Sequence, residues 1–154
     1  MKYESKGGKN MAGFGKITPT LPVVDIKRAK KFYGDILGCK ITMEDPGPGA
    51  MLRCGDGELY LYQRGPSKAD HTVASIAVDH IETEVKDLRR KGVKFEEYDI
   101  PSMGLKTVDG IATMGDMRGA WFKDSEGNVL SLVEMIRVKP EVKRGLREKV
   151  LVGR

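Results

Sequence analysis

The hydrophobic and polar positions follow the same order twice along the chain. Short stretches rich in β-branched, aromatic and alternating apolar residues predict strands, and glycine and proline clusters separate them. The strands expected in the first half are 17–24, 39–43, 50–54 and 58–63, and those expected in the second half are 72–78, 93–97, 114–123 and 128–135. A segment with helical periodicity follows the first strand of each half, so each half is expected to run β-α-β-β-β.

The two helical segments have matching start and stop signals. Each follows a Val-Asp pair, and each ends at a glycine thirteen residues after its aspartate. Asp25 is expected to cap the first helix and Gly38 to end it, because short polar side chains satisfy free N–H groups and glycine tolerates the terminal backbone turn. The apolar residues at helical spacing are Ala29, Phe32, Tyr33 and Ile36 in the first segment and Ile81, Val85 and Leu88 in the second.

The repeat predicts an α+β fold built from two βαβββ modules, residues 17–64 and 72–136. Each module has one short mixed sheet with one face to bury, and fusing them allows the sheets to form an open, barrel-like trough with the helices outside. The concave side of such a trough is a natural ligand pocket. In the second module, residues 98–115 are rich in glycine and methionine and are expected to form a loop beside this site.

Charge divides the chain into a body and two basic ends. The formal net charge is +5, with +3 in the N-terminal tail, residues 1–16, and +5 in the C-terminal extension, residues 137–154, which leaves −3 on the body, residues 17–136. The extension has apolar residues every fourth position and is expected to be an amphipathic helix. The ends are interpreted as solvated tails, with docking of the extension on the body, although basic ends can also bind nucleic acid or an acidic partner.

Composition excludes several classes. No apolar run approaches the ~18 residues that a membrane helix needs, and residues 1–16 have no apolar core of a secretory signal. Two cysteines, Cys39 and Cys54, are too few for a disulfide framework, and no histidine lies near either one to make it a nucleophile. A reducing cytoplasm is therefore expected. His71 and His80, the only histidines, are interpreted as loop or surface residues.

Two separated motifs resemble one known family. The run from Leu21 to Gly38 carries Leu-Pro-Val-Val-Asp-Ile, then Arg-Ala, Phe-Tyr and Ile-Leu-Gly, and the run from Phe122 to Glu134 carries Asp-Ser-Glu-Gly-Asn. Both resemble the vicinal oxygen chelate superfamily, which includes glyoxalase I, bleomycin-resistance proteins, extradiol dioxygenases and methylmalonyl-CoA epimerase. The resemblance covers about residues 17–136 and implies the paired-module fold, while one fold hosts many functions.

The resemblance also implies where a metal would be bound. Metal-using members carry four ligands, usually His, Glu or Gln, and the matching positions in this chain are Thr18, Tyr60, Val73 (or its neighbour Thr72) and Ser131. None of these side chains is a histidine or a carboxylate, the ligands that Zn²⁺, Mg²⁺ or Fe²⁺ sites need. The sequence therefore predicts no metal and no other cofactor at this position.

The same positions suggest a different kind of pocket. Tyr60 and Tyr62 alternate on one strand, so they share a face, and with Thr18 and Ser131 they are expected to line an aromatic, uncharged cavity, unless they only fill the core. Trp121 is expected to face the trough, with Phe122 on the helix side. Arg118 is the cation expected near the mouth. The predicted ligand-binding set is Thr18, Tyr60, Tyr62, Val73, Ser131, Trp121 and Arg118, with catalytic residues unknown.

Three function hypotheses follow. The first is a cytoplasmic, homodimeric protein that holds a small molecule in the trough without a metal, comparable in logic to bleomycin-resistance members. The second is a glyoxalase-like, metal-dependent lyase or isomerase, or a dioxygenase relative, with displaced ligands. The third is an interaction module that binds nucleic acid or an acidic partner through the basic ends, with no role at a membrane.

Overall fold

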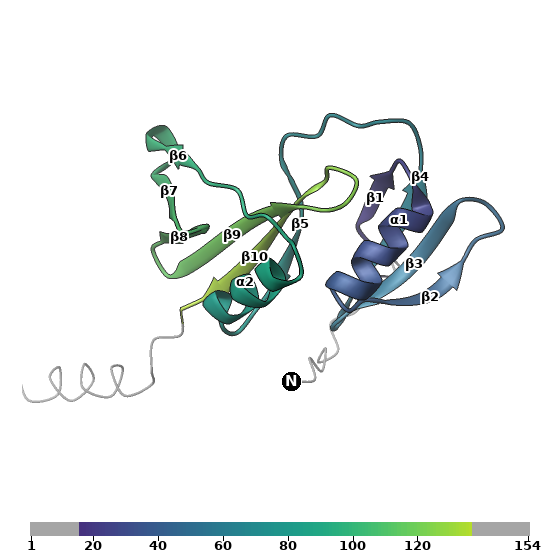
Figure 1. Ribbon diagram of the computed structural model, residues 1–154, viewed down its shortest axis with the longest axis horizontal. Coiled ribbons are helices and arrows are strands. Elements are labelled where there is room, and N and C mark those ends of the chain that lie inside the picture. Colours follow the sequence, from purple (N-terminus) through teal and green to yellow (C-terminus); the bar gives the residue numbers. More distant parts are fainter. Residues whose placement is uncertain (1–15, 137–154) are drawn as a thin grey trace, which may run out of the picture.

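The computed structural model describes residues 16–136, and the fold is α+β with two open sheets (Figure 1). The first sheet has the order β1-β4-β3-β2 and the second has the order β5-β10-β9-β8-β7-β6. In each sheet the first strand of the module pairs in parallel with the last, and every other pairing is antiparallel. This is the paired-module arrangement that the repeat predicts.

The first module follows the expected order closely. Its elements are β1 (Thr20–Val23), α1 (Ile26–Lys31), η1 (Phe32–Ile36), β2 (Lys40–Glu44), β3 (Gly49–Cys54) and β4 (Gly57–Gln63). Asp25 caps α1 by accepting hydrogen bonds from the backbone N–H groups of Lys27 at 2.9 Å and Arg28 at 3.0 Å. The helix continues as a π-helical turn, η1, and Gly38 ends it with a φ of +70°, as the sequence predicts.

The second module repeats this order with an insertion. Its elements are β5 (Thr72–Ala77), α2 (Ile81–Arg90), β6 (Asp99–Ile100), the 3-10 turn η2 (Pro101–Met103), β7 (Leu105–Val108), β8 (Ile111–Met114), β9 (Met117–Lys123) and β10 (Val129–Met135). Ile81, Val85 and Leu88 are the buried face of α2, as expected.

Two expectations for the second module are wrong. Residues 93–97 do not form a strand, because their pairing with β9 is limited to a bridge from Phe95 to Phe122 and a hydrogen bond from the Glu96 N–H to the Trp121 carbonyl. Residues 98–115 are not a loop. They extend the sheet through β6, β7 and β8, and Asp109-Gly110, both at positive φ, make the tight turn between β7 and β8.

Each sheet has a covered face and an open face. The covered face packs under the module's helix, and in β9 it includes Ala120 and Phe122, which are fully buried. The open face is the opposite side, which neither α1 nor α2 covers. Its residues in β4 and β9 include Tyr60, Tyr62 and Trp121, which alternate with the buried positions.

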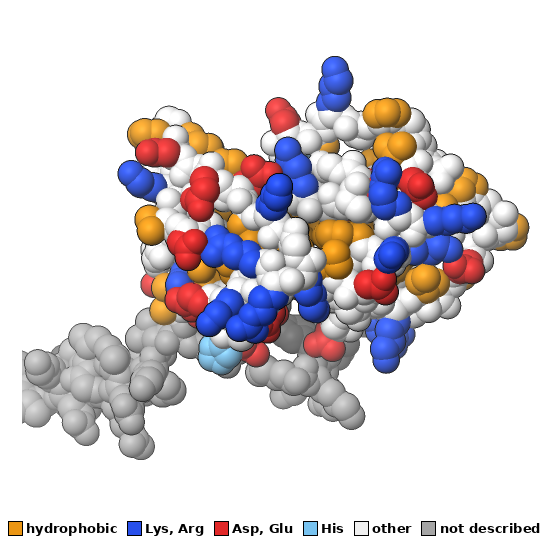
Figure 2. Space-filling model, in the orientation of Figure 1, with side chains coloured by type: hydrophobic (Ala, Val, Ile, Leu, Met, Phe, Trp, Pro, Cys, Tyr) orange, Lys and Arg blue, Asp and Glu red, His pale blue; other side chains and the backbone are white. Residues whose placement is uncertain are grey.

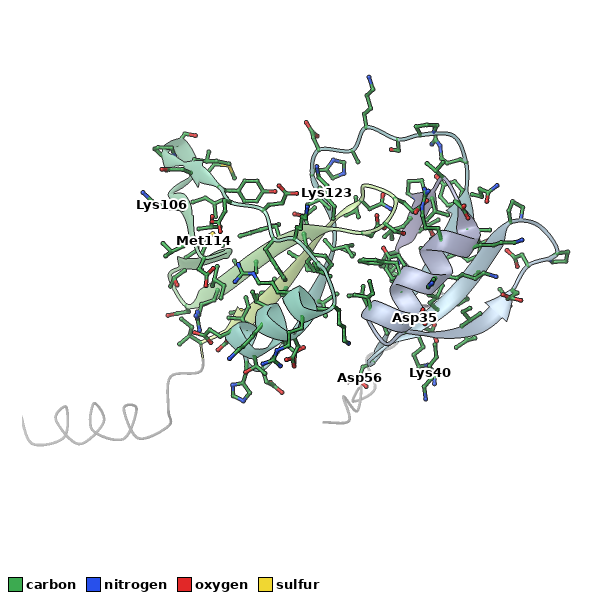
Figure 3. The ribbon with its side chains drawn as sticks, in the orientation of Figure 1. Asp35, Lys40, Asp56, Lys106, Met114 and Lys123 are labelled. Atoms are coloured by element: carbon green, nitrogen blue, oxygen red, sulfur yellow. A yellow bond between two sulfur atoms is a disulfide. The ribbon has the colours of Figure 1, made fainter. Side chains whose placement is uncertain are left out.

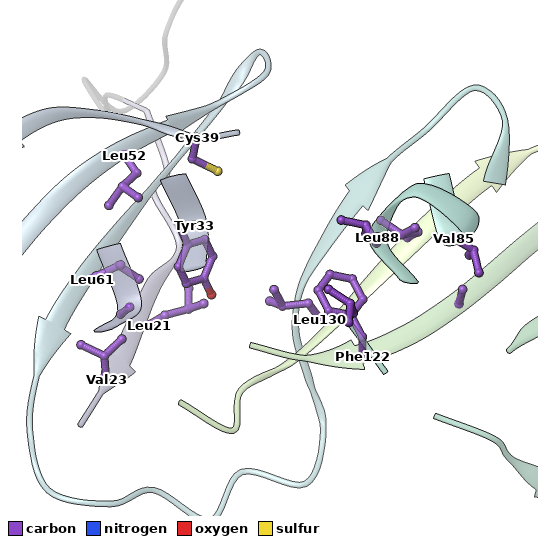
Figure 4. Close-up of a cluster of buried hydrophobic side chains, with 14 of the residues drawn as sticks. Leu21, Val23, Tyr33, Cys39, Leu52, Leu61, Val85, Leu88, Phe122 and Leu130 are labelled. Carbon is purple, nitrogen blue, oxygen red and sulfur yellow. The ribbon is translucent and has the colours of Figure 1, made fainter. Parts of the chain in front are cut away.

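One apolar core runs through both modules. Tyr33 and Leu61 belong to it on one side, and Leu88, Phe122 and Leu130 on the other (Figure 4). Burying side chains of this size stabilises the fold by roughly 1.5–3 kcal/mol each relative to exposure. The modules are thus held to each other by the same kind of packing that holds each sheet to its helix.

A disulfide joins Cys39 and Cys54 at the start of β2 and the end of β3. The sequence does not predict this bond, because the number and local context of two cysteines do not indicate which strands lie side by side. The β2–β3 hairpin is antiparallel and places Lys40 opposite Arg53. Cys39, just before Lys40, therefore lies opposite Cys54, just after Arg53. Disulfides persist mainly in oxidising compartments, so this bond lends no support to the expected cytoplasmic location, which stays a prediction.

The surface on the helix side of the molecule carries charges of both signs. In Figure 2, lysine, arginine and acidic side chains are interspersed over the helix side of the molecule. No helix within residues 16–136 is long and apolar enough to cross a membrane. The basic tail and the expected C-terminal helix lie outside the described residues, apart from Lys16.

Candidate functional site

The open face of the first sheet carries three of the predicted site residues. Tyr60 pairs with Thr20 across β1, and Tyr62 pairs with Pro22, so both phenols project from the same side of β4. Thr18 precedes β1 and is half-buried, with its carbonyl accepting a weak hydrogen bond of 3.5 Å from the Thr20 hydroxyl. The structure therefore brings Thr18, Tyr60 and Tyr62 to one region, as predicted.

Tyr60 is held against the end of its sheet. Its phenol donates a hydrogen bond to Asp45 Oδ2, in the connection between β2 and β3. A Cβ atom on Gly49 would lie 2.1 Å from the Tyr60 hydroxyl and 2.8 Å from Cζ, so only glycine lets the ring lie across the backbone here. The hydrogen bond to Asp45, with some burial, raises the pKa of Tyr60, which keeps the phenol protonated.

The open face of the second sheet carries Ser131 and Trp121. These two residues are directly paired across β10 and β9. Ser131 is 2% exposed, and its hydroxyl donates to the hydroxyl of Ser75 on β5 at 2.8 Å. Both predictions of face are therefore correct, and Ser75 is a neighbour that the sequence did not single out.

Trp121 forms an aromatic platform with Tyr98. A Cβ atom on Gly119 would lie 2.8 Å from Trp121 Cη2, so the indole lies flat over this glycine on the open face. The ring of Tyr98 meets the indole edge-on, with ring centroids 5.6 Å apart and an angle of 72° between the planes. Edge-to-face geometry fixes the position of both rings, and it leaves Trp121 half-buried rather than enclosed.

Two predicted residues occupy other environments. Val73 sits at a bulge, since Val129 pairs with Thr72 and Leu130 pairs with Ala74, and its half-buried side chain packs against the core. Arg118 lies on the covered face of β9.

On the covered face, Arg118 forms an ion pair with Glu82 of α2. Its guanidinium nitrogen also lies 3.7 Å from a carboxylate oxygen of Glu134. Its guanidinium therefore links α2 to β9, and the prediction that Arg118 lies at the mouth of the trough is wrong.

Glu134 also caps the second helix. Its carboxylate accepts a hydrogen bond of 2.8 Å from the Ile81 N–H, at the start of α2. This places it on the covered face, as strand alternation from Ser131 predicts. Gln63 does the same for α1 by accepting from the Ile26 N–H at 3.0 Å, so the two modules share this device.

The donor set does not fit a metal. At the four positions that match the metal-binding pattern, Tyr60 is protonated and bonded to Asp45, Ser131 is bonded to Ser75, and Thr18 and Val73 offer a hydroxyl and an alkyl group. Within residues 16–136, no three His, Cys, Asp or Glu side chains are grouped so that they could hold an ion. These four positions therefore lack the imidazole and carboxylate side chains that a metal site of this pattern needs.

A separate pocket of about 590 Å³ opens between the modules. Its walls are largely apolar and include Tyr33, Leu37, Ile76 and Leu130, with the Cys39–Cys54 disulfide on one side. Asp56, at the tip of the β3–β4 hairpin (Figure 3), lies on its rim. None of the predicted site residues lines this pocket, but Glu58 and Ser75, which belong to the open faces, do.

Several contributors to the open faces were missed from the sequence. Asp45, Tyr98, Gly49 and Gly119 act through contacts between neighbouring strands. A signal was present in part, since Gly119 is two residues before Trp121 on one strand and therefore shares its face. Nothing local indicated that Asp45 meets Tyr60.

The comparisons with known proteins agree with the fold. The family model described as Glyoxalase/Bleomycin resistance protein/Dioxygenase superfamily matches residues 13–132. No curated protein sequence matches the chain.

Solved structures with the same fold include three of different function. The fosfomycin resistance protein FosX from Listeria monocytogenes is 12% identical, with a TM-score of 0.59 and coverage of 79% of this chain and 93% of its own. Lactoylglutathione lyase from Agrobacterium tumefaciens is 16% identical, with a TM-score of 0.58 and coverage of 80% and 96%. TnmS3, an antibiotic binding protein from Streptomyces sp. CB03234, is 19% identical, with a TM-score of 0.58 and coverage of 78% and 96%. Identities this low establish the shared fold alone.

Proposed function

Because the chain belongs to the Glyoxalase/Bleomycin resistance protein/Dioxygenase superfamily, we propose that it binds a small organic molecule on the open faces of its sheets without a metal ion. Fold neighbours include an antibiotic binding protein as well as a lyase and a resistance protein. The choice among such functions has to come from the chain's own side chains.

The observation that carries the proposal is the platform of Trp121 over Gly119. A tryptophan that lies flat on an open sheet, fixed by the edge of Tyr98, offers an aromatic surface for stacking without further ordering. The neighbouring polar groups, Ser131 and Ser75, are uncharged and already bonded to each other. Such a surface suits recognition of an aromatic or amphipathic molecule better than it suits acid–base chemistry.

A thermal-shift screen of aromatic and polyketide-like compounds tests the proposal. A ligand that binds only the folded protein raises its melting temperature, by mass action. The expected result is a stabilising compound whose effect disappears in Trp121→Ala and persists in Lys68→Ala, a control in the connection between the modules. A compound that raises the melting temperature of Trp121→Ala as much as that of the wild type would contradict the proposed site.

Metal analysis of the purified protein separates the proposal from the enzymatic alternative. We expect no stoichiometric divalent ion, and ligand binding that is unchanged by a chelator. A stoichiometric ion that supports turnover would overturn the metal-free function and favour a glyoxalase-like enzyme with displaced ligands.

We also propose that the chain is a homodimer. Strand β2 is an edge of the first sheet, and Ile41 and Met43 on it are 44% and 49% exposed. An unpaired edge with exposed apolar side chains is typically covered by another chain. Light scattering that gives a monomer at micromolar concentration would contradict this, and Ile41→Lys is expected to weaken the dimer. The cytoplasmic location stays a prediction.

A further inference from the structure

The open face of the first sheet is chemically divided along its strands. At one end Lys40, Arg53 and Glu58 stand side by side across β2, β3 and β4. Glu58 lies 3.7 Å from Arg53 and 3.2 Å from Lys16, so this end is ion-paired. In Figure 3, Lys40 and Asp56 mark this end of the module.

The middle of the same face is apolar and aromatic. Met43 and Met51 pair across β2 and β3, and Met51 pairs with Tyr60 on β4. Tyr62 follows on the next position of the face, opposite Gly49. All four side chains are at least partly exposed to solvent.

Asp45 lies at the other end of the face, next to the two tyrosines. Its N–H donates to the Gly49 carbonyl at 3.1 Å, and Gly49 is the residue that pairs with Tyr62. Within residues 16–136, Asp45 has no basic side chain within the 4.0 Å of an ion pair.

Tyr60 bonds to Asp45 without neutralising it. The phenol donates to Oδ2, and a carboxylate retains several further acceptor positions, so Oδ1 remains able to accept from a ligand. A half-buried carboxylate beside aromatic rings repels anions. A cation is attracted here by two groups. The carboxylate attracts it through its negative charge, and the aromatic rings attract it through their negative faces.

We infer that a molecule bound on the open face of the first sheet carries a protonated nitrogen in or beside an aromatic ring system, with that nitrogen held by Asp45 and the rings of Tyr60 and Tyr62. This inference rests on the proposed function and names the class of its ligand. The protonated N–H group donates to Asp45 Oδ1, and the aromatic part lies along the methionine and tyrosine surface. Gly49 is essential to the arrangement, because a larger residue would displace the Tyr60 ring from the carboxylate.

The test compares two planar tricyclic probes of similar size. Proflavine is a cation at pH 7, and acridone is neutral. We expect the protein to bind proflavine more tightly than acridone by about tenfold, from one charge-assisted contact. In Asp45→Asn, which keeps an oxygen to accept from Tyr60, proflavine binding should weaken by about tenfold, while acridone binding should not change.

Glu58→Gln is the matched control, because it removes one negative charge from the ion-paired end of the same face. It should leave the preference for proflavine intact. Equal affinity for the two probes, an equal loss in both variants, or binding of neither probe at about 1 mM would overturn the inference. Circular dichroism and melting temperature confirm that each variant is folded.

The failure of this inference can be distinguished from the failure of the proposed function. If acridone binds and Trp121→Ala abolishes its binding, while Asp45→Asn has no effect on proflavine, the open-face function stands and the cationic ligand class is wrong. If neither probe binds, the ligand class is wrong, and the compound screen decides the function separately.

Discussion

The phenol of Tyr33 donates a hydrogen bond of 2.7 Å to Asp124 Oδ2, and this bond joins the helix of the first module to the last hairpin of the second. Tyr33 is 1% exposed and Asp124 is 6% exposed. Asp124 also accepts from the amide of Asn128, whose other hydrogen bond reaches the Pro22 carbonyl on β1 at 2.9 Å. A buried polar network thus crosses the apolar core where the two modules meet.

Tyr33→Phe is expected to destabilise the protein by about 1.5–3 kcal/mol. The substitution removes the phenol and leaves the buried Asp124 carboxylate with one partner fewer, which costs more than the loss of a neutral hydrogen bond. Burial, together with the charge of Asp124, raises the pKa of Tyr33 far above its usual value, so the phenol donates at every ordinary pH. Urea denaturation at pH 7 measures the change, and a difference below about 0.5 kcal/mol would show that the bond contributes little.

Glu126 should make stability depend on pH in the acid range. Its side chain is fully buried, and it accepts from Arg28 and from the N–H groups of Val24 at 3.0 Å and Asp25 at 2.8 Å. Burial alone would raise its pKa, but these hydrogen bonds outweigh that effect and lower the pKa to about 2. A lowered folded-state pKa means that this stabilisation is complete above about pH 5 and is lost as the pH falls toward 2.

The expected loss for Glu126 is on the order of 2 kcal/mol, since the guanidinium of Arg28 is half exposed and its attraction is partly screened. Denaturation curves recorded between about pH 6 and about pH 2 measure this loss of stability. Glu126→Gln should be less stable at neutral pH, and its free energy of unfolding should depend less on pH in this range. If the free energy of unfolding of the variant depends on pH as steeply as that of the wild type, other groups cause the acid sensitivity.

Reducing the Cys39–Cys54 disulfide should lower stability by roughly 3 kcal/mol. The bond closes a loop across 15 positions of sequence, which limits the freedom of the unfolded chain. Denaturation with and without a thiol reductant measures the effect. The double variant Cys39→Ser with Cys54→Ser is the control and should be insensitive to the reductant. Alkylation of both thiols in the unreduced, unfolded protein would show that the bond does not form.

Gly119→Ala should displace the Trp121 ring. A methyl group at this position would come within 2.8 Å of the indole, and the ring would have to leave the platform. We expect a shifted tryptophan fluorescence spectrum, weaker ligand binding and a loss of about 1–3 kcal/mol in stability from overpacking. Trp121 is the only tryptophan, so the spectrum reports this site alone.

Gly65→Ala is the matched control for Gly119→Ala, because no other atom lies within 4 Å of the position that its Cβ would take. It should leave the tryptophan spectrum and ligand binding unchanged. An unchanged spectrum in both variants would contradict the stacking of Trp121 on Gly119.

The sequence predicted the order of the modules and the face of most strand residues. Capping by Asp25, the glycine stop at residue 38 and the alternation of Trp121 with Phe122 are local properties, and the structure confirms each of them. These features depend on periodicity and on single-residue backbone preferences, which the sequence carries directly.

The contacts that define the candidate site were decided by tertiary structure. Asp45 is 15 residues from Tyr60, and Arg118 is 36 residues from Glu82, so no local sequence pattern predicts either contact. Residues 98–115 contain glycines typical of loops, yet β8 pairs with β9, β7 with β8 and β6 with β7, so most of this segment is sheet. Alternation assigns a side chain to a face, but which partner it meets depends on strand register and on the packing of one module against the other, and those are set by the burial of the whole core.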